Sequence, residues 1–399
     1  MRWALAALAL LSACDKLRAI PGVQPRPGTS APAPPAVAMG PWILDPQPTA
    51  ATVCWVTDEP SLGRVWYGQA LTDRLAREEG AKVIEHRVLL HGLTPGTQYR
   101  YSIEGGAAGR FTSAPEPGAR GPIEVLVYGD NRTNSGDHAL VVRAAAAEPV
   151  QLALHTGDMV VNAREEQLWR DWFREEADLL TRMPLIATIG NHEMTDDGVA
   201  YSKYFQRRDR PAYWSADYGP VHLIVMDSFE RSAGASPHSG AVSDAQRAWI
   251  EEDLRAVPPD RHVWVLVHQG PYAHPAHPRP GHGGSEAVRT ALLSARRAHP
   301  IEAVFAGHEH YYERGEIDGL KYFVLGGGGA PLDDPDPKAR GVEAAAKALS
   351  YAVVEVCGCH ARGSVKDIAG KVIDSFRLAG CAAACGAPLA SAHKQDGGT

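Results

Sequence analysis

Five apolar runs, each followed at once by a polar turn, dominate the middle of the chain. They lie at 125–128, 152–155, 185–187, 263–267 and 303–305. Short runs of aliphatic and β-branched residues predict buried strands. Because the carboxyl ends of parallel strands meet at one edge of an α/β sheet, we expect the turns to build a single site there.

Helical periodicity separates these strands and supports an α/β class for this part of the chain. Helices are predicted over 137–148, 163–180 and 243–257, the second with Leu168, Trp169, Trp172 and Phe173 on one stripe. A hairpin is predicted over 213–228, with its turn at Gly219-Pro220. Further strands are predicted at 322–325, 351–356 and 366–378.

The region before these strands has a different pattern, in which short runs of alternating apolar and polar residues are separated by turn residues. These runs lie at 51–57, 63–67, 86–91, 99–103 and 109–112. Period-two alternation in several short strands predicts a small β-sandwich over residues 39–116. The stretch from Leu93 to Tyr99 resembles the tyrosine corner of fibronectin type III domains, and Trp55 falls where their early core tryptophan is expected. A sandwich carries no chemistry by itself, so we expect a packing and spacing module.

The first residues have the pattern of an export signal. Residues 1–14 combine a charged start with a short apolar run, and Leu11-Ser12-Ala13-Cys14 resembles the lipobox of bacterial lipoproteins, in which the cysteine is lipidated. An ordinary secretory signal with an incidental cysteine is the alternative. Residues 15–38 are rich in Pro and Ala and predict an extended tether. We expect an exported protein anchored by lipid at Cys14, on the periplasmic or extracellular face of a bacterial membrane.

Composition and charge narrow the classes of function. The 399 residues are 44% hydrophobic and carry a formal net charge of -7, which gives no electrostatic footprint for nucleic acid. An exported protein can keep disulfides, and two bridges among Cys357, Cys359, Cys381 and Cys385 are favoured over a thiolate metal site. A second domain is predicted over 121–379, followed by a cysteine-containing disordered tail at 380–399.

The turns after the five strands hold residue types that bind metal ions. Carboxylate, amide and imidazole donors without a thiolate suit Zn, Mn or Fe. Two such ions, about 3.5–4 Å apart, generate a hydroxide nucleophile and stabilise displacement at phosphorus. The sequence therefore predicts phosphoester hydrolysis by a dinuclear metal centre. The candidate metal ligands are Asp130, Asp158, Asn191, His268, His308 and His310.

The ordered motifs Gly129-Asp130, Gly157-Asp158, Gly190-Asn191-His192-Glu193, His268 and Gly307-His308-Glu309-His310 resemble those of the calcineurin-like metallophosphoesterase superfamily. With a fibronectin-like domain in front, the chain is most similar to the purple acid phosphatase branch. The resemblance implies a four-layer α/β/β/α sandwich behind the small all-β domain.

The family pattern also implies a role for each residue. Asp130, Asp158 and His310 would hold the first metal ion. Asp158 would bridge to the second, which Asn191, His268 and His308 would complete. A metal-bound hydroxide would attack phosphorus, and His192 would contact the phosphoryl group or protonate the leaving oxygen.

The first metal position departs from the family pattern. Arg132 stands where many relatives have a histidine, and Val161 where purple acid phosphatases have a tyrosine. One protein ligand is therefore missing, and His138, Asn162 or water is expected to replace it. Without that tyrosine, we expect no purple tyrosinate-to-iron absorption. Arg132 is expected to bind substrate phosphate, with a surface ion pair as the alternative.

Several other histidines and glutamates lie near these motifs. His282 resembles a residue that lines the substrate pocket in related enzymes, whereas His155 is expected to be a core histidine. His274 and His277 are expected to be solvated loop residues. Glu193 and Glu309 are expected to orient neighbouring ligands without binding metal.

These features favour an acid-phosphatase-like phosphomonoesterase, with a phosphodiesterase or nucleotidase on the same site as the alternative. A surface binding or adhesion lipoprotein without turnover is the alternative of another class, and the intact donor set argues against it. The expected partners are a small phosphate ester and, through Cys14, the membrane. The sequence fixes neither the natural substrate nor the metal pair.

Overall fold

The computed structural model describes residues 34–78, 80–132, 135–206, 211–236 and 239–378. The predicted lipidation site Cys14, most of the tether and the tail lie outside the described residues. Among the described residues, no helix has the length and apolarity needed to cross a membrane.

Residues 37–112 form two antiparallel sheets, with strand orders β1-β2-β5 and β4-β3-β6-β7. Their facing side chains, including Trp55 and Tyr99, form one buried cluster. The hydroxyl of Tyr99 accepts the backbone N–H of Thr94 at 2.9 Å, which is the contact expected of a tyrosine corner. The strands are β1 (Val37–Leu44), β2 (Ala50–Ser61), β3 (Arg64–Gly68), β4 (Arg74–Arg77), β5 (Val83–His91), β6 (Gln98–Ile103) and β7 (Ala108–Thr112).

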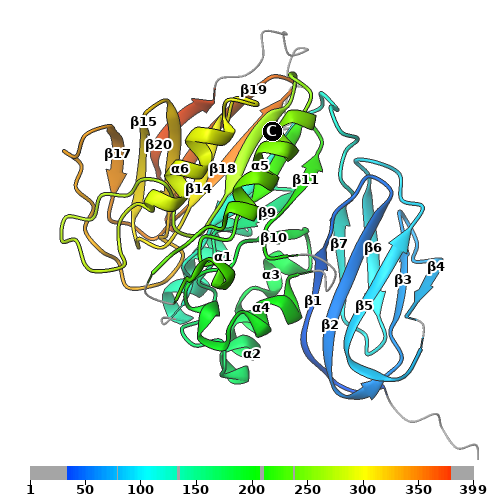
Figure 1. The fold of residues 1–399 in the computed structure, drawn as a ribbon. Helices are drawn as coiled ribbons and strands as arrows, with labels where there is room; N and C mark the ends of the chain where they lie inside the picture. The colour runs from blue at the N-terminus through cyan, green and yellow to red at the C-terminus, as the bar shows by residue number, and fades with distance from the viewer. Residues whose placement is uncertain (1–33, 79, 133–134, 207–210, 237–238, 379–399) are drawn as a thin grey trace, which may run out of the picture. The chain divides into compact units, whose positions relative to one another are not determined.

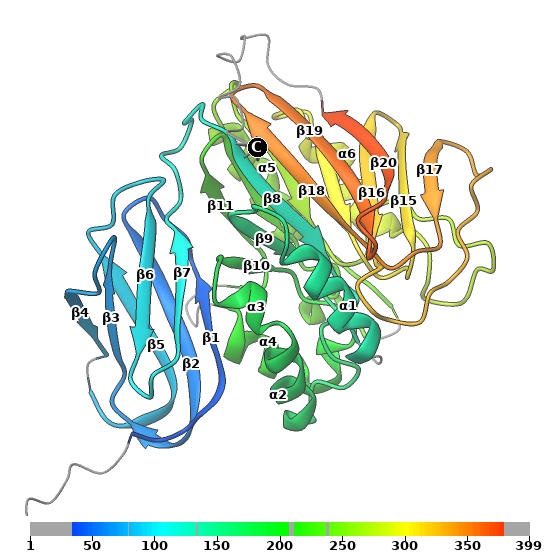
Figure 2. The same ribbon diagram turned by 180° about the vertical axis from the view of Figure 1, so that it is seen from behind.

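The rest of the chain contains two larger mixed sheets (Figure 1). The six-stranded sheet has the order β10-β9-β8-β18-β19-β20, and β8, β9 and β10 are parallel (Figure 2). Its strands are β8 (Ile123–Tyr128), β9 (Leu152–His155), β10 (Leu185–Ala187), β18 (Ser350–Cys357), β19 (His360–Asp367) and β20 (Val372–Leu378).

The seven-stranded sheet has the order β11-β12-β13-β14-β16-β15-β17, and β12, β13, β14 and β16 are parallel. Its strands are β11 (Trp214–Tyr218), β12 (Val221–Val225), β13 (His262–Leu266), β14 (Ala303–Ala306), β15 (Tyr312–Ile317), β16 (Leu320–Leu325) and β17 (Val342–Ala346).

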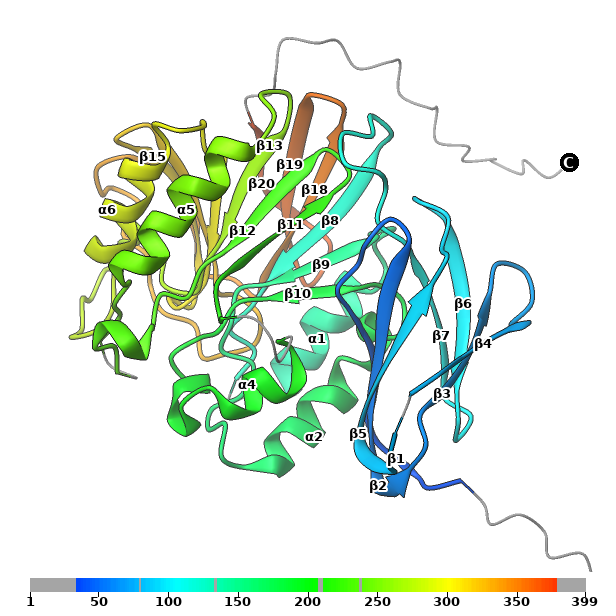
Figure 3. The same cartoon turned by 45° about the vertical axis from the view of Figure 1, so that its right-hand side comes forward.

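Helices cover the outer faces of the two sheets, which gives the four layers expected from the sequence (Figure 3). Val127 and Phe305, one from each sheet, belong to the apolar cluster between the sheets. Trp172 packs in a second cluster with strands of the first sheet, and Leu292 packs in a third with strands of the second. The helices are α1 (Ser135–Ala145), α2 (Glu166–Glu175), α3 (Ala177–Leu180), α4 (Val199–Tyr204), α5 (Asp244–Ala256) and α6 (Glu286–Ala295).

The structure corrects two predicted elements. The helix expected over 163–180 is split into α2 and α3 at Glu176, whose buried carboxylate accepts hydrogen bonds from Tyr128 and His138. The strand expected over 366–378 is the end of one strand, a turn, and the next strand. Cys359 is disulfide-bonded, and the predicted bridge partners Cys381 and Cys385 lie outside the described residues.

Candidate metal centre

The candidate ligands follow five strands, β8, β9 and β10 of one sheet and β13 and β14 of the other. Asp130, Asp158 and His308 have positive φ values of 59°, 56° and 73°. Non-glycine residues rarely adopt this left-handed backbone, and they keep it where surrounding contacts determine the loop. Three strained turns therefore aim their side chains toward one edge, as the sequence pattern predicts.

One group of donors converges around Asn191. Nε2 of His268 lies 3.0 Å from Oδ1 of Asn191 and 3.3 Å from Oδ1 of Asp158. Nδ1 of His308 lies 3.0 Å from the same Asn191 oxygen and 3.3 Å from Nε2 of His268. We call these four residues the second position, the name that the predicted ligand roles give it.

The other ring nitrogens fix the tautomers at the second position. Nδ1 of His268 donates to the carbonyl of Thr156 at 2.7 Å, and Nε2 of His308 donates to the carbonyl of Gly281 at 2.9 Å. In the neutral rings, the nitrogens that face Asn191 therefore carry lone pairs. Lone pairs and oxygens that face one another repel unless a cation lies between them, so this donor set fits a metal ion of the Zn, Mn or Fe type.

Burial and neighbouring charges shift the pKa values of His268 and His308 in opposite directions. Burial and the neighbouring His268 lower the pKa of His308 to about 3, so its ring is neutral and ready to bind a metal. Burial also opposes protonation of His268, but the Asp158 carboxylate outweighs it and raises the pKa of His268 to about 9. A metal ion at the second position would compete with that proton, because both need Nε2.

Asp130, Asp158 and His310 form a second group, which we call the first position. One ligand atom from each lies within 4.8 Å of the others, and all three side chains are buried. Nε2 of His310 is 3.8 Å from Oδ1 of Asp130, while its Nδ1 donates to the carbonyl of Pro331 at 2.9 Å. Burial and the Arg132 charge lower the pKa of His310 to about 4, so this ring is also neutral.

Arg132 lies within the first position. Its Nε donates to Oδ2 of Asp158 at 3.2 Å, and its Nη2 lies 3.2 Å from Nε2 of His310. Burial opposes ionisation of Asp158, but the nearby His268, His192 and Arg132 outweigh it and hold the pKa of Asp158 well below its usual range. By contrast, burial and the Asp158 charge raise the pKa of Asp130 well above its usual range.

Glu193 holds the loops of the centre together, as the sequence suggests. Its Oε2 accepts the backbone N–H groups of Asp158 at 2.9 Å and Gly190 at 2.8 Å, and its Oε1 accepts that of Met159 at 2.9 Å. The side chain is fully buried. Glu193 thus ties the turn after β9 to the turn after β10.

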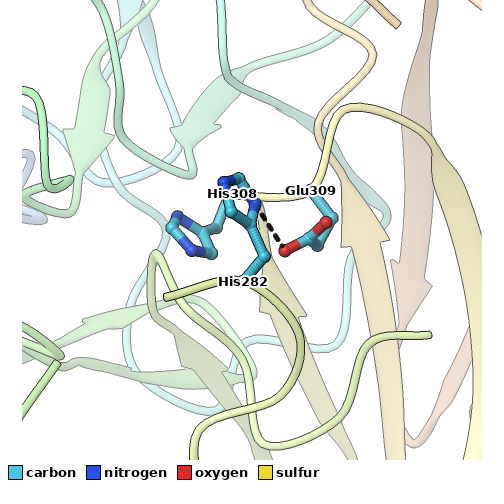
Figure 4. A group of neighbouring side chains, drawn as sticks. All are labelled: His282, His308 and Glu309. Carbon is cyan, nitrogen blue, oxygen red and sulfur yellow. Dashed lines mark hydrogen bonds and ion pairs between the residues drawn. The ribbon is translucent and has the colours of Figure 1, made fainter. Parts of the chain in front are cut away.

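Glu309 and His282 support His308 from the other side (Figure 4). Oε1 of Glu309 lies 3.0 Å from Nδ1 of His282 and accepts the N–H of Gly283 at 2.7 Å. The rings of His282 and His308 stack, with centroids 5.1 Å apart. These three side chains are close enough to hold a cation. Nε2 of His308 already donates to the carbonyl of Gly281 and is not available to a cation held by these three side chains. The arrangement therefore favours a role for His282 and Glu309 in holding the His308 ring in place.

The structure does not place the two proposed replacement ligands at the first position. Both ring nitrogens of His138 are engaged, Nδ1 with Glu175 at 2.9 Å and Nε2 with Glu176 at 2.8 Å. The amide of Asn162 donates to Glu165 at 2.7 Å in the exposed turn before α2. These expectations are corrected, because Glu175 and Glu176 engage His138 and Glu165 engages Asn162, contacts that the sequence did not indicate.

The remaining predicted histidines divide into three cases. His155 is a core histidine, as expected, since it bonds to Asn131 and accepts the N–H of Gly157 at 3.1 Å. His277 is exposed, also as expected. His274 is not simply solvated, because its Nδ1 lies 2.8 Å from the buried carboxylate of Glu313.

An open cleft of about 660 Å³ adjoins the centre and contains the predicted substrate residues. His192 lies there, with Nδ1 bonded to the carbonyl of Val161 at 2.7 Å, together with Arg132 and His282. The cleft also holds Arg164 and Arg231, which the sequence analysis missed because they belong to no motif. Its lining residues are Arg132, Val161, Arg164, Asn191, His192, Met194, Thr195, Asp197, Arg231, Pro280, Gly281, His282 and His308.

Comparison with known proteins agrees with this geometry. The model of the family described as calcineurin-like phosphoesterase matches residues 123–312, which include all six candidate ligands. Residues 123–312 form a calcineurin-like phosphoesterase domain. The matched region begins at the first residue of β8 and ends at the first residue of β15, and the two sheets continue beyond it to β20.

Similar curated proteins extend the match beyond this domain. Purple acid phosphatase 21 of Arabidopsis thaliana is 30% identical over 271 residues, which cover 61% of this chain and 58% of that protein. Phosphoenolpyruvate phosphatase of Allium cepa is 26% identical over 326 residues, which cover 71% of this chain and 64% of that protein. The chain therefore spans less than two thirds of the length of either relative.

Among solved structures, a purple acid phosphatase from yellow lupin (Lupinus luteus) has the same fold. Its TM-score is 0.71 at 16% identity, over 86% of this chain and 74% of that one. PhoD has a TM-score of 0.67 at 13% identity, over 87% of this chain and 94% of that one. Both likenesses include more of the chain than the phosphoesterase domain alone.

Proposed function

We propose that this protein is a metal-dependent phosphoric ester hydrolase, and that phosphomonoesters are its substrates. The observation that carries the proposal is the convergence of Asp158, Asn191, His268 and His308 at one edge of two sheets. Curated relatives that are named as phosphatases support a hydrolase over a binding protein without turnover. A metal ion bound there would act as a Lewis acid and lower the pKa of a bound water.

The chain's own residues would position the substrate and control protons. Asp158 would connect the two positions, because Oδ1 faces His268 and Oδ2 faces Arg132. The carbonyl of Val161 holds the Nδ1 proton of His192, so Nε2 of that ring is the nitrogen available to exchange a proton with the leaving oxygen. The backbone N–H of His192 donates to Oδ1 of Asp158 at 3.0 Å, which fixes this histidine beside the centre.

The cleft supports a small anionic ester as the substrate. Arg132, Arg164 and Arg231 line it. Arg231 is paired with Asp197 at 2.8 Å, so part of its charge is already compensated. Guanidinium groups match phosphoryl oxygens in a fork, and an open cleft of this size admits the remainder of a small molecule.

The test measures hydrolysis of p-nitrophenyl phosphate and bis(p-nitrophenyl) phosphate after the protein is reconstituted with Zn, Mn or Fe. We expect turnover of the monoester to exceed that of the diester, and Asp158→Asn to reduce it by about 10²–10³-fold, the scale of losing one electrostatic stabiliser. Faster turnover of the diester would assign the alternative substrate class. Unchanged turnover in Asp158→Asn, or no turnover with any metal, would contradict the proposal.

We also propose that lipid at Cys14 anchors the protein to a membrane. This residue lies outside the described residues, and its support is the lipobox-like Leu11-Ser12-Ala13-Cys14 alone. In a bacterial host, Cys14→Ser should move the protein from the membrane fraction to the soluble fraction. An unchanged membrane fraction would contradict the anchor without affecting the proposed activity.

A further inference from the structure

The first and second positions of the centre differ in the groups that face their donor atoms. At the second position, Nε2 of His268 and Nδ1 of His308 face the oxygen of Asn191, and the other nitrogen of each ring donates to a backbone carbonyl. At the first position, Oδ2 of Asp158 and Nε2 of His310 face the guanidinium of Arg132, each at 3.2 Å. A cationic donor thus already satisfies the acceptors of the first position.

From this difference we propose that Arg132 takes the place of the first metal ion, so that the protein binds one metal ion per chain, at the second position. The inference deepens the proposed function and rests on it. Arg132 stands where the family pattern has a metal ligand, and it supplies a fixed positive charge there. The centre would therefore contain one metal ion and one guanidinium in place of two metal ions.

Lone-pair geometry is the first argument. A metal ion bound by Asp158 and His310 would lie about 2.0–2.2 Å from each donor atom. Nδ1 of His310 donates to the carbonyl of Pro331, so Nε2 offers the ring's single lone pair, and that lone pair already accepts a hydrogen bond from Nη2 of Arg132. Metal binding at the first position would therefore require the guanidinium to leave both partners.

Charge is the second argument. Arg132 and a metal ion at the first position would both lie beside the carboxylate of Asp158 and Nε2 of His310. Like charges that are buried together repel, so a divalent ion there would have to displace the guanidinium.

Donor number is the third argument. The second position offers one oxygen or nitrogen atom from each of Asp158, Asn191, His268 and His308, which meets the usual four-coordinate demand of zinc. The first position offers three protein ligands, and the structure engages His138 and Asn162 elsewhere. The first position thus combines a smaller donor set with an internal competitor.

The test is metal stoichiometry, which does not depend on activity. Metal-free full-length protein is titrated with Zn²⁺ by calorimetry, and bound metal is counted by mass spectrometry after desalting. We expect one ion per chain in the wild type and two in Arg132→His, which exchanges the cation for a ligand. Arg132→Asn provides a second variant if Arg132→His fails to fold, and it should also admit a second ion. Arg132→Lys keeps a cation, and Arg164→Gln changes an arginine that lines the cleft without contacting the donors, so both should retain one ion.

Electron paramagnetic resonance of the Mn²⁺ form gives an independent reading. We expect the six-line spectrum of an isolated ion in the wild type and an exchange-coupled signal in Arg132→His. Two ions in the wild type, or one ion in folded Arg132→His and Arg132→Asn, would overturn this inference and leave the proposed hydrolase intact. No bound metal in the wild type would overturn both.

Discussion

The carboxylate of Glu193 accepts the backbone N–H of Asp158 at 2.9 Å, although the two residues follow different strands. The same oxygen accepts the N–H of Gly190, so a side chain that binds no metal sets the distance between two ligand turns. Bonds of this kind hold ligand atoms where a metal ion needs them before the ion arrives.

Glu193→Gln should weaken metal binding while the fold remains. A carboxamide replaces one accepting oxygen with an NH₂ group, which then faces a backbone donor. We expect the affinity for Zn²⁺, measured by calorimetry, to fall about 10–100-fold, as for other supporting residues around metals. Glu166→Gln, an exposed glutamate of α2, should leave the affinity unchanged. Equal affinities of Glu193→Gln and the wild type would show that the turns hold their positions without this carboxylate.

Gly157→Ala should disturb the centre in two ways, by straining the backbone and by a steric clash of the added Cβ. Gly157 has a φ of +95°, and a Cβ there would lie 2.8 Å from Nδ1 of His268 and 3.0 Å from the N of Gly190. Gly370 has a φ of +78° with no atom within 4 Å of such a Cβ, so Gly370→Ala is the matched control for backbone strain alone. We expect Gly157→Ala to lose about 1–3 kcal/mol more stability than the control, as overpacking does, and to lose bound zinc. Similar losses in the two variants, measured by chemical denaturation, would contradict this packing argument.

His138 should make stability depend on pH. Burial opposes its protonation, but hydrogen bonds to Glu175 and Glu176 outweigh burial and raise the pKa of His138 to about 9. A histidine with a raised pKa stabilises the fold fully below its unfolded pKa of about 6.5, and this stabilisation is lost as the pH rises toward 9. From pH 6 to pH 9, the free energy of unfolding of the wild type should fall by up to ~3 kcal/mol more than that of His138→Gln.

The control for this titration is His277→Gln, which changes an exposed histidine. Denaturant titrations at the two pH values should show the wild-type pH dependence in this variant. If His138→Gln keeps the full pH dependence, another group must be responsible for it.

His282 should affect substrate binding more than metal binding. It lies in the cleft beside His308, and its Nδ1 is engaged with Glu309. Loss of a hydrogen bond to a charged phosphate is worth about 1.5–3 kcal/mol, so His282→Asn should raise the KM for p-nitrophenyl phosphate about 10-fold or more. Metal content should stay constant, and His277→Asn should change neither quantity. A fall in metal content with an unchanged KM would limit the role of His282 to its stacking contact with His308.

The sequence by itself predicted the five strands that precede the candidate ligand turns, and it supplied the candidate donors. Apolar runs such as 263–267 are buried wherever they pack, and a polar turn that ends in His268 follows directly in the chain. The order of the motifs was sufficient to identify the phosphoesterase domain and to predict its layers. Local patterns carry this information because side-chain periodicity and turn chemistry depend on neighbouring residues.

Only the tertiary structure decided which side chains meet. No local signal indicated that Glu176, a break between two helices, would engage His138, or that Arg164 and Arg231 would line the cleft of the centre. Nor did the sequence place Arg132 between Asp158 and His310, a contact that spans 178 residues. Such contacts depend on how two sheets pack and on which side-chain rotamers fit in a close-packed interior. Neither can be inferred from the spacing of residues along the chain.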